Sequence, residues 1–333
     1  MRRIYLLSTV ILFAASIILM FNYSTSTEKT SDKTYYSAFH KNYKIFTPEI
    51  PTTVDFAEEE TPLNIFYIRE KLDEELLRNT YFHSSTIGLM KRSNRWFPVI
   101  EPLLAEYNIP DDFKYLSLVE SGFENVTSPK GAKGFWQFME KTAREYGLEV
   151  NDAIDERYNV EKSTKAACQY LIDSYDEFKS WTLVAAAYNA GKRRIHETIE
   201  KQGVENYYEM YLNEETTQYI FRILAVKEII EKPTQYGFYL READLYPLIP
   251  TKKIKITETV PDLYQFAAKH HVNYRTLKMF NPWLRTDNLP NKSERTYYIK
   301  IPKAGYMKYD KLDKQMGNSE NIFNDTLKVN ELK

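Results

Sequence analysis

The chain has 333 residues, 43% of them hydrophobic and 27% charged, so it can build a sizeable core and is long enough for two domains with tails. Its formal net charge of −1 argues against a general nucleic-acid binder, because phosphate binding needs a basic face. The single cysteine, Cys168, excludes an intrachain disulfide, and we interpret it as a small core residue on an apolar helical stripe.

The N-terminus has the pattern of a targeting segment. Arg2 and Arg3 precede an apolar run from Ile4 to Phe21, and positive charge before such a run directs export with the basic end left in the cytoplasm. The run is roughly 18 residues long, just enough to span a bilayer. We therefore expect residues 1–23 to form an uncleaved membrane anchor, with a cleaved signal peptide as the alternative. Either way, the rest of the chain is expected to work outside the cytoplasm.

The region after this segment divides into a linker and a helical domain. Residues 24–60 are polar and without a sustained period, so we expect a linker, whose end can include a short ordered piece. From Pro62 to Lys232 hydrophobic residues recur at helical spacing, which predicts an all-α globular domain over residues 61–235. The predicted helices cover residues 65–76, 86–91, 95–107, 111–121, 135–146, 161–179, 183–200 and 215–230.

Glu120 lies in the last turn of one of the short helices. Phe113, Leu116 and Val119 give that helix a buried face. Gly122 predicts its end, because glycine readily takes a left-handed conformation. Low polarity and the negative end of the helix both disfavour a charged carboxylate, so we expect the pKa of Glu120 to be raised. A glutamate that stays protonated near neutral pH can act as a general acid; the alternative is a solvated residue or one half of a salt bridge.

Several common kinds of site have no support in the sequence. The five histidines show no metal-ligand spacing and no P-loop or G-x-G-x-x-G motif occurs, so we expect neither a metal nor a cofactor. Ser121 stands outside any G-x-S-x-G elbow. Unusual residues gather instead in Gly134-Phe-Trp-Gln-Phe138, in Ala187-Tyr-Asn-Ala-Gly191 and at Tyr219. Amides and tyrosines beside aromatic rings suit a ligand rich in hydroxyl and acetamido groups, although Trp136 and Tyr188 could also be core residues.

These motifs resemble a known family, the soluble lytic transglycosylase domain. Four motifs match in order and spacing: Glu120-Ser121-Gly122-Phe123, Gly131-Ala132, Gly134-Phe-Trp-Gln-Phe138 and Ala187-Tyr-Asn-Ala-Gly191. The layout is similar to that of the membrane-bound lytic transglycosylase D group, except that Phe135 stands where leucine is common. The resemblance implies a mainly α, lysozyme-like fold with Glu120 as the catalytic residue. It also implies a sugar-binding cleft lined by Ser121, Gln137, Tyr188, Asn189 and Tyr219.

The activity implied by the resemblance is that of a peptidoglycan lytic transglycosylase on the periplasmic side of the cell envelope. Such an enzyme cleaves the β-1,4 bond between N-acetylmuramic acid and N-acetylglucosamine and leaves a 1,6-anhydro-muramic end, here with Glu120 as sole acid and base. A hydrolytic muramidase would need a second carboxylate, for which Asp152, Asp155 and Glu156 are available. Acidic residues just before a helix, however, ordinarily cap it. A non-catalytic peptidoglycan-binding scaffold is the remaining alternative, and the intact Glu120 argues against it.

After Pro250 the pattern changes to a small α+β domain. Two alternating stretches, residues 254–256 and 297–301, enclose two helical ones, which predicts a βααβ domain over residues 250–303 and a polar tail over residues 304–333. This region resembles a LysM module, which implies binding to glycans that contain N-acetylglucosamine. Thr259-Val-Pro-Asp-Leu263 lacks the glycine usual at that turn, so glycan binding and a structural role both stay open. The expected partners are peptidoglycan strands and, through the N-terminal segment, the membrane.

Overall fold

The computed structural model describes residue 37 and residues 45–316, with side chains described as far as residue 312. The chain divides into two compact units, and the elements from β1 (Asp55–Phe56) to α12 (Tyr309–Met316) all belong to the unit Pro48–Lys333. The anchor expected at residues 1–23, most of the linker and the end of the polar tail lie outside the described residues. In the part of the chain that is described, no helix combines the length and the apolar character needed to cross a membrane.

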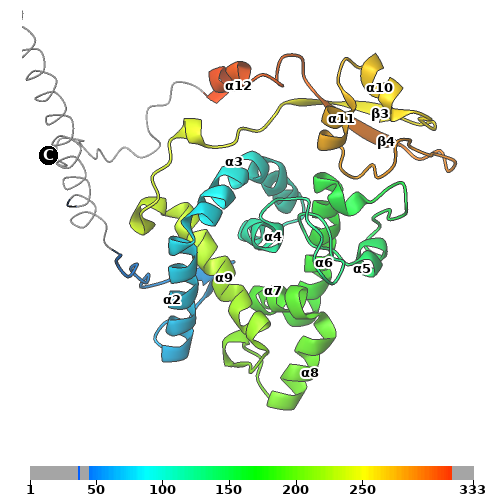
Figure 1. Ribbon diagram of the computed structural model, residues 1–333. Helices are drawn as coiled ribbons and strands as arrows, with labels where there is room; N and C mark the ends of the chain where they lie inside the picture. The colour runs from blue at the N-terminus through cyan, green and yellow to red at the C-terminus, as the bar shows by residue number, and fades with distance from the viewer. Residues whose placement is uncertain (1–36, 38–44, 317–333) are drawn as a thin grey trace, which may run out of the picture. The chain divides into compact units, whose positions relative to one another are not determined.

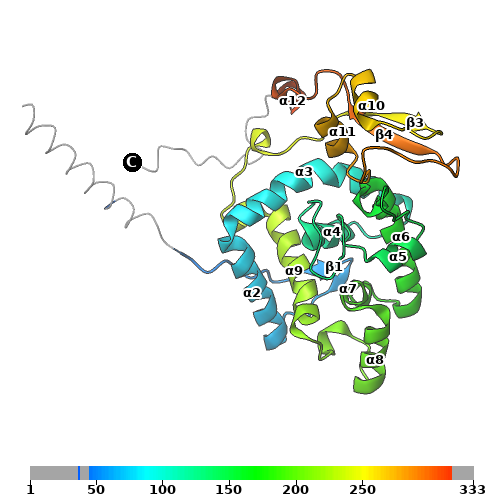
Figure 2. The ribbon, with the colours of Figure 1, turned by 45° about the vertical axis from the view of Figure 1, so that its right-hand side comes forward.

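Helices dominate the chain from residue 66 to residue 231, as predicted. The α-helices are α2 (Phe66–Tyr81), α3 (His83–Glu106), α4 (Phe113–Ser121), α5 (Glu140–Glu145), α6 (Val160–Phe178), α7 (Trp181–Ala190), α8 (Lys192–Gln202) and α9 (Glu214–Glu231). Short 3₁₀ turns are η1 (Glu156–Tyr158), η2 (Tyr207–Glu209), η3 (Pro233–Tyr236) and η4 (Glu242–Asp244). In both ribbon views α4 lies inside a ring of longer helices, and it packs against α3 and α9 (Figures 1 and 2). Its position explains why Leu116 and Leu118 are fully buried.

The helix α3 differs from the two shorter helices predicted over residues 86–91 and 95–107. It runs without interruption through Pro98 and Pro102. Each proline lacks the N–H that a helix interior uses, which normally ends or kinks the helix. Packing against α6 and α4 keeps this one continuous, since most helical stability in proteins comes from tertiary contacts.

Two further predictions of helices are wrong at positions that matter for the site. The helix predicted over residues 183–200 is broken at Gly191, whose φ of +88° separates α7 from α8. Of the helix predicted over residues 135–146, only the second half is helical, as α5. Its beginning is a tight turn over residues 134–137 instead, closed by a β-bridge between Lys133 and Phe138.

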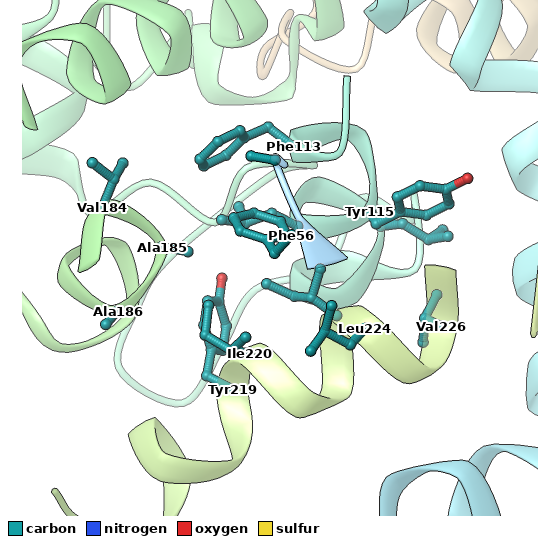
Figure 3. Close-up of a cluster of buried hydrophobic side chains, with 14 of the residues drawn as sticks. Phe56, Phe113, Tyr115, Val184, Ala185, Ala186, Tyr219, Ile220, Leu224 and Val226 are labelled. Carbon is teal, nitrogen blue, oxygen red and sulfur yellow. The ribbon is translucent and has the colours of Figure 1, made fainter. Parts of the chain in front are cut away.

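The end of the expected linker is part of the helical core, which corrects the predicted boundary at residue 60. Asp55–Phe56 (β1) and Glu59–Glu60 (β2) pair as a short antiparallel hairpin. Phe56 is fully buried, and its ring meets that of Phe113 edge to face with centroids 5.1 Å apart. Figure 3 shows it between α4 and the side chains of α9, such as Ile220. Val54, Phe56 and Ala57 stand among acidic residues without a helical or strand period, although all three are buried in the core.

The C-terminal part has the predicted βααβ order. Its elements are β3 (Thr251–Ile256), α10 (Leu263–Lys269), α11 (Tyr274–Phe280) and β4 (Tyr297–Pro302). The strands pair antiparallel, with Thr251 opposite Pro302 and Ile256 opposite Tyr297. The polar tail begins with a helix that was not predicted, α12 (Tyr309–Met316).

Candidate active site

Glu120 lies in the last turn of α4, as the sequence predicted. Gly122 takes the left-handed conformation with a φ of +58°, and its N–H donates to Leu118 O at 2.7 Å, which ends the helix. Glu120 as a residue is partly exposed, and its Oε1 accepts a hydrogen bond from the hydroxyl of Tyr219 in α9 at 2.5 Å. Tyr219 itself is buried, so Glu120 has a fixed protein partner while it keeps some contact with solvent.

The surroundings of Glu120 favour its protonated form. Burial is the largest influence and raises the pKa of Glu120 to about 6, from an ordinary value of 4.5. The hydrogen bond from Tyr219 and the charge of Arg222 lower this pKa by less, and the charge of Glu215 adds to the rise. The upward shift expected from the sequence is confirmed. A carboxyl with this pKa can both donate a proton and hold a negative charge near neutral pH.

The turn at residues 134–137 places one amide beside a buried aromatic anchor. Trp136 is fully buried and its Nε1 donates to Thr164 Oγ1 at 2.9 Å, so it is a core residue. Gln137 is partly exposed, with a φ of +47°, and its Nε2 donates to Gly134 O at 2.7 Å. Only glycine fits at Gly134, because a Cβ there would lie 1.9 Å from Arg157 O. The turn therefore depends on close backbone packing from a segment about 20 residues later.

The helix α7 brings Tyr188 and Asn189 to the same region. The hydroxyl of Tyr188 donates to Trp136 O at 2.5 Å, next to Gln137 in the turn. Burial raises the pKa of Tyr188 and the charge of Glu120 adds to this rise, so the phenol and the carboxyl are near neighbours. Asn189 is partly exposed, and its Oδ1 accepts from Thr216 Oγ1 at 2.9 Å, one turn before Tyr219 in α9.

Ser121 is engaged within the protein. Its buried hydroxyl donates to Phe135 O at 3.0 Å and accepts from Phe123 N at 3.1 Å. These contacts tie the end of α4 to the turn at residues 134–137. The sugar contact expected for Ser121 stays a prediction, and its observed contacts are those of a residue that positions the turn.

Glu59 of β2 holds the N-terminus of α7, which carries Tyr188 and Asn189. Its carboxylate accepts from the backbone N–H groups of Trp181 and Thr182, the latter at 2.9 Å. A helix start leaves such amides unpaired, and its dipole favours a negative charge there. Sequence reasoning missed Glu59 because it lies 121 residues before Ser180, in the region expected to be linker.

The acidic residues considered for a hydrolytic site have other partners. Asp155 is buried and accepts from Nε and Nη2 of Arg157, both at 2.8 Å. Glu156 is also buried and forms an ion pair with Lys162. Neither carboxylate is therefore free to act on a sugar. Asp152 is exposed.

Glu215 is a further carboxylate near the site, one that sequence reasoning did not consider as a second acid. It is exposed in the first turn of α9, and its negative charge contributes to the raised pKa of Glu120. Its position four residues before Tyr219 puts both on one face of α9. No local pattern marks it out, because acidic residues are common in the first turn of a helix.

Two known domain families match this chain. The family described as "Transglycosylase SLT domain" matches residues 98–211, and that described as "Soluble lytic transglycosylase C-terminal LysM-like domain" matches residues 252–305. The first range includes Glu120 and Gln137, whereas Tyr219 lies beyond it. The chain carries both domains, which confirms the two resemblances and the expected fold class, a lysozyme-like helical domain with a LysM-like module.

Curated relatives give the same result. The chain is 27% identical over 242 residues to "Membrane-bound lytic murein transglycosylase D" of Escherichia coli (strain K12), a match that covers 71% of this chain and 52% of that protein. The same figures hold for the protein of that name in Escherichia coli O6:H1. A "Putative tributyltin chloride resistance protein" of Alteromonas sp. (strain M-1) is 30% identical over 125 residues, 37% of this chain and 60% of that protein. The chain spans about half the length of the first two relatives.

Proposed function

We propose that this chain, which carries an SLT transglycosylase domain and a LysM-like domain, is a peptidoglycan lytic transglycosylase with Glu120 as its sole acid and base. The observation that carries the proposal is the pairing of Glu120 with the Tyr219 hydroxyl in surroundings that raise the pKa of Glu120 to about 6. Among the described residues no cation forms an ion pair with Glu120, so nothing there holds it permanently charged. Such a carboxyl can give up a proton and take one back.

Cleavage begins when protonated Glu120 donates to the oxygen between N-acetylmuramic acid and N-acetylglucosamine. The bond from C1 of the muramic sugar to that oxygen breaks, the oxygen leaves as a hydroxyl of N-acetylglucosamine, and positive charge develops at C1. The acetamido group of the same muramic sugar stabilises this charge. General acid transfer of this kind contributes on the order of 10²–10⁴-fold to the rate.

The second step uses no water. Ionised Glu120 accepts the proton of the muramic C6 hydroxyl, whose oxygen attacks C1 and closes a 1,6-anhydro ring. The hydrogen bond from Tyr219 favours the charged carboxylate between the two transfers. Glu120 ends protonated, as it began, so one residue can serve both steps.

The neighbours of Glu120 supply the positioning that the reaction needs. The partly exposed amides of Gln137 and Asn189 can bind the acetamido and hydroxyl groups of the glycan. Tyr188 and Ser121, whose hydroxyls bind backbone carbonyls of residues 136 and 135, keep the turn and α4 in place beside the sugar. Holding the sugar in a reactive conformation supplies much of the remaining acceleration.

The relatives support a place in the cell envelope. The name of the Escherichia coli proteins describes them as membrane-bound, and peptidoglycan lies outside the cytoplasmic membrane. We assign the apolar N-terminal segment, residues 1–23, as an uncleaved anchor that leaves the catalytic domain on the periplasmic side. A cleaved signal peptide would give the same side without the attachment. The LysM-like domain adds a second contact with the glycan strand.

Digestion of purified cell walls tests this function. We expect released muropeptides whose muramic ends are one water lighter than hydrolytic ends, as measured by mass spectrometry. Glu120→Gln should lower release on the order of 10²–10⁴-fold while wall binding persists. Glu124→Gln is the matched control, because Glu124 is exposed, four residues away, and paired with Arg92. Hydrated ends would show a muramidase instead, and wall binding without any release by the unaltered protein would show a scaffold.

A further inference from the structure

Residues 153–158 of the helical domain form both backbone and core contacts with the LysM-like domain. The backbone N–H of Asp155 donates to Trp283 O at 2.9 Å, and that of Arg285 donates to Ala153 O at 2.8 Å. Between them Ile154 forms a β-bridge with Leu284. Strand-like pairing of this kind fixes both the distance and the direction of the two backbones.

The same segment contributes to the core of the LysM-like domain. Ile154 and Tyr158 are 1% and 5% exposed, and both belong to the buried cluster that contains Trp283 and Leu284. The guanidinium of Arg285 lies over the ring of Tyr158, 4.7 Å from its centroid. A domain whose core includes side chains from another domain cannot separate from it without exposing apolar surface.

Ion pairs on either side of the segment strengthen the attachment. Glu149 accepts from Nη1 of Arg295 at 3.0 Å and from the hydroxyl of Tyr297 at 2.8 Å. Glu161 forms ion pairs with Lys300 and with Lys253, the latter at 3.3 Å. The two glutamates belong to the helical domain, and their partners all belong to the LysM-like domain.

The opposite side of this segment holds the turn of the candidate active site. Arg157, only 3% exposed and bound to Asp155, donates through Nη1 to Phe138 O at 3.3 Å and Gly131 O at 3.4 Å. These two carbonyls flank the turn at residues 134–137. The hydroxyl of Tyr158 shares a hydrogen bond of 3.0 Å with Thr127 Oγ1. The carbonyl of Arg157 also packs against Gly134, where no Cβ would fit.

We infer that the LysM-like domain is a fixed part of the catalytic cleft, and that it positions the Gln137 turn through the segment 153–158. Asp155 connects the two sides. Its backbone N–H donates to the LysM-like domain, and its carboxylate binds the guanidinium of Arg157, which itself binds the turn. Asp155 and Arg157 are positioning residues. The effect on rate rests on the proposed function, whereas the mechanical coupling does not. A tethered binding module would instead raise only the local concentration of the polymer.

A docking variant, Ile154→Ala/Arg295→Ala/Lys300→Ala, tests the inference in the full-length protein. The matched control is Lys252→Ala/Lys269→Ala, which removes the same charge from exposed residues that form no ion pair within residues 45–312. The substrate is a soluble, peptide-free oligomer of alternating N-acetylglucosamine and N-acetylmuramic acid, on which polymer attachment has no influence. We expect kcat/KM of the docking variant to fall roughly 10- to 100-fold, because a small misplacement far from the chemistry has effects of this size. The control should match the unaltered protein.

Amide hydrogen exchange supplies a readout that does not depend on activity. Exchange of residues 131–138 should accelerate in the docking variant and stay unchanged in the control. If the triple variant does not fold, the same exchange measurement on the double variant Arg295→Ala/Lys300→Ala tests the inference. Unchanged exchange at residues 131–138, together with full activity on the soluble oligomer, would overturn the inference. If the unaltered protein produces no anhydro ends at all, the proposed function fails, but the exchange comparison still decides the coupling.

Discussion

Glu120 and Asp155 are two carboxyls in the interior of one helical domain with opposite surroundings. Asp155 accepts two hydrogen bonds from the buried guanidinium of Arg157; burial raises its pKa, but that hydrogen bonding and charge lower the pKa below the ordinary value. Glu120 accepts its hydrogen bond from the neutral Tyr219, and burial dominates, so its pKa rises to about 6. The comparison teaches that the partner decides the use of a buried carboxyl. A cation makes it a fixed structural charge, and a phenol leaves it able to exchange protons.

Removal of the Glu120 carboxyl should have the largest effect. Glu120→Gln keeps the shape of the side chain but cannot donate the proton, so we expect release of muropeptides to fall on the order of 10²–10⁴-fold. The measurement is the initial rate of release from purified cell walls. A rate within a few-fold of the unaltered protein would remove Glu120 from the chemistry.

The corresponding change at Asp155 should act on stability. Asp155→Asn leaves the guanidinium of Arg157 buried without its charge partner, which costs about 3–5 kcal/mol in the free energy of unfolding. Urea unfolding followed by circular dichroism measures it. The exposed pair Lys179–Asp176 gives the control, because Asp176→Asn should cost at most about 1 kcal/mol. Equal losses in the two variants would contradict this account of Asp155.

Loss of the Tyr219 hydroxyl should shift the pH dependence of the activity. The hydrogen bond from Tyr219 favours the charged form of Glu120, so Tyr219→Phe should raise the pKa of Glu120 further. The decline of activity at high pH should therefore move to higher pH. The rate should also fall by roughly 10- to 100-fold, since a hydrogen bond to a charged group is worth about 1.5–3 kcal/mol. Tyr115→Phe is the matched control, because its hydroxyl binds Glu231 at 3.0 Å instead. A profile that shifts equally in both variants would argue against the contact.

Glu120 should also reduce stability at neutral pH. Because the pKa of Glu120 is higher in the folded protein than in the unfolded chain, its protonated form favours folding. This contribution to the free energy of unfolding is complete below pH 4.5 and is lost as the pH rises through about 6. The difference between 4.5 and about 6 corresponds to about 2 kcal/mol. Glu120→Gln does not titrate, so relative to the unaltered protein it should gain about 2 kcal/mol in the free energy of unfolding between pH 4 and pH 7.5. A constant difference across this range would contradict the raised pKa.

The smallest effect is expected at Glu215. Its negative charge is the smallest of the influences on the pKa of Glu120, so Glu215→Gln should move the decline of activity slightly toward lower pH. The pH profile of muropeptide release shows this directly. A loss comparable to that of Glu120→Gln would identify Glu215 as a second catalytic carboxylate, which would favour a hydrolytic mechanism.

The sequence predicted what depends on neighbouring residues. The end of α4 at Gly122, the place of Glu120 before it and the βααβ order of the C-terminal domain all follow from local pattern. It could not predict the break at Gly191, because a glycine inside a periodic helix is also tolerated. Nor could the sequence predict that Phe56, which stands in a stretch rich in acidic residues, is fully buried in the core.

Contacts between residues far apart in the chain account for the rest of the site. Glu59 holds the start of α7 from 121 residues before Ser180, and Tyr219 meets Glu120 from 99 residues away. Asp155 is a different case, because its partner Arg157 is only two residues away; the sequence does not show that this guanidinium turns back to bind the carboxylate. Patterns of hydrophobicity do not show which side chain from elsewhere in the sequence will contact a given carboxyl in the fold.

Digestion of cell walls in H₂¹⁸O tests most directly whether a single carboxyl completes the reaction without water. If Glu120 donates a proton to the leaving oxygen and then accepts the proton of the C6 hydroxyl as that oxygen attacks C1, the new muramic ends should carry the 1,6-anhydro ring and no ¹⁸O. Incorporation of one ¹⁸O atom at each new muramic end would contradict the account.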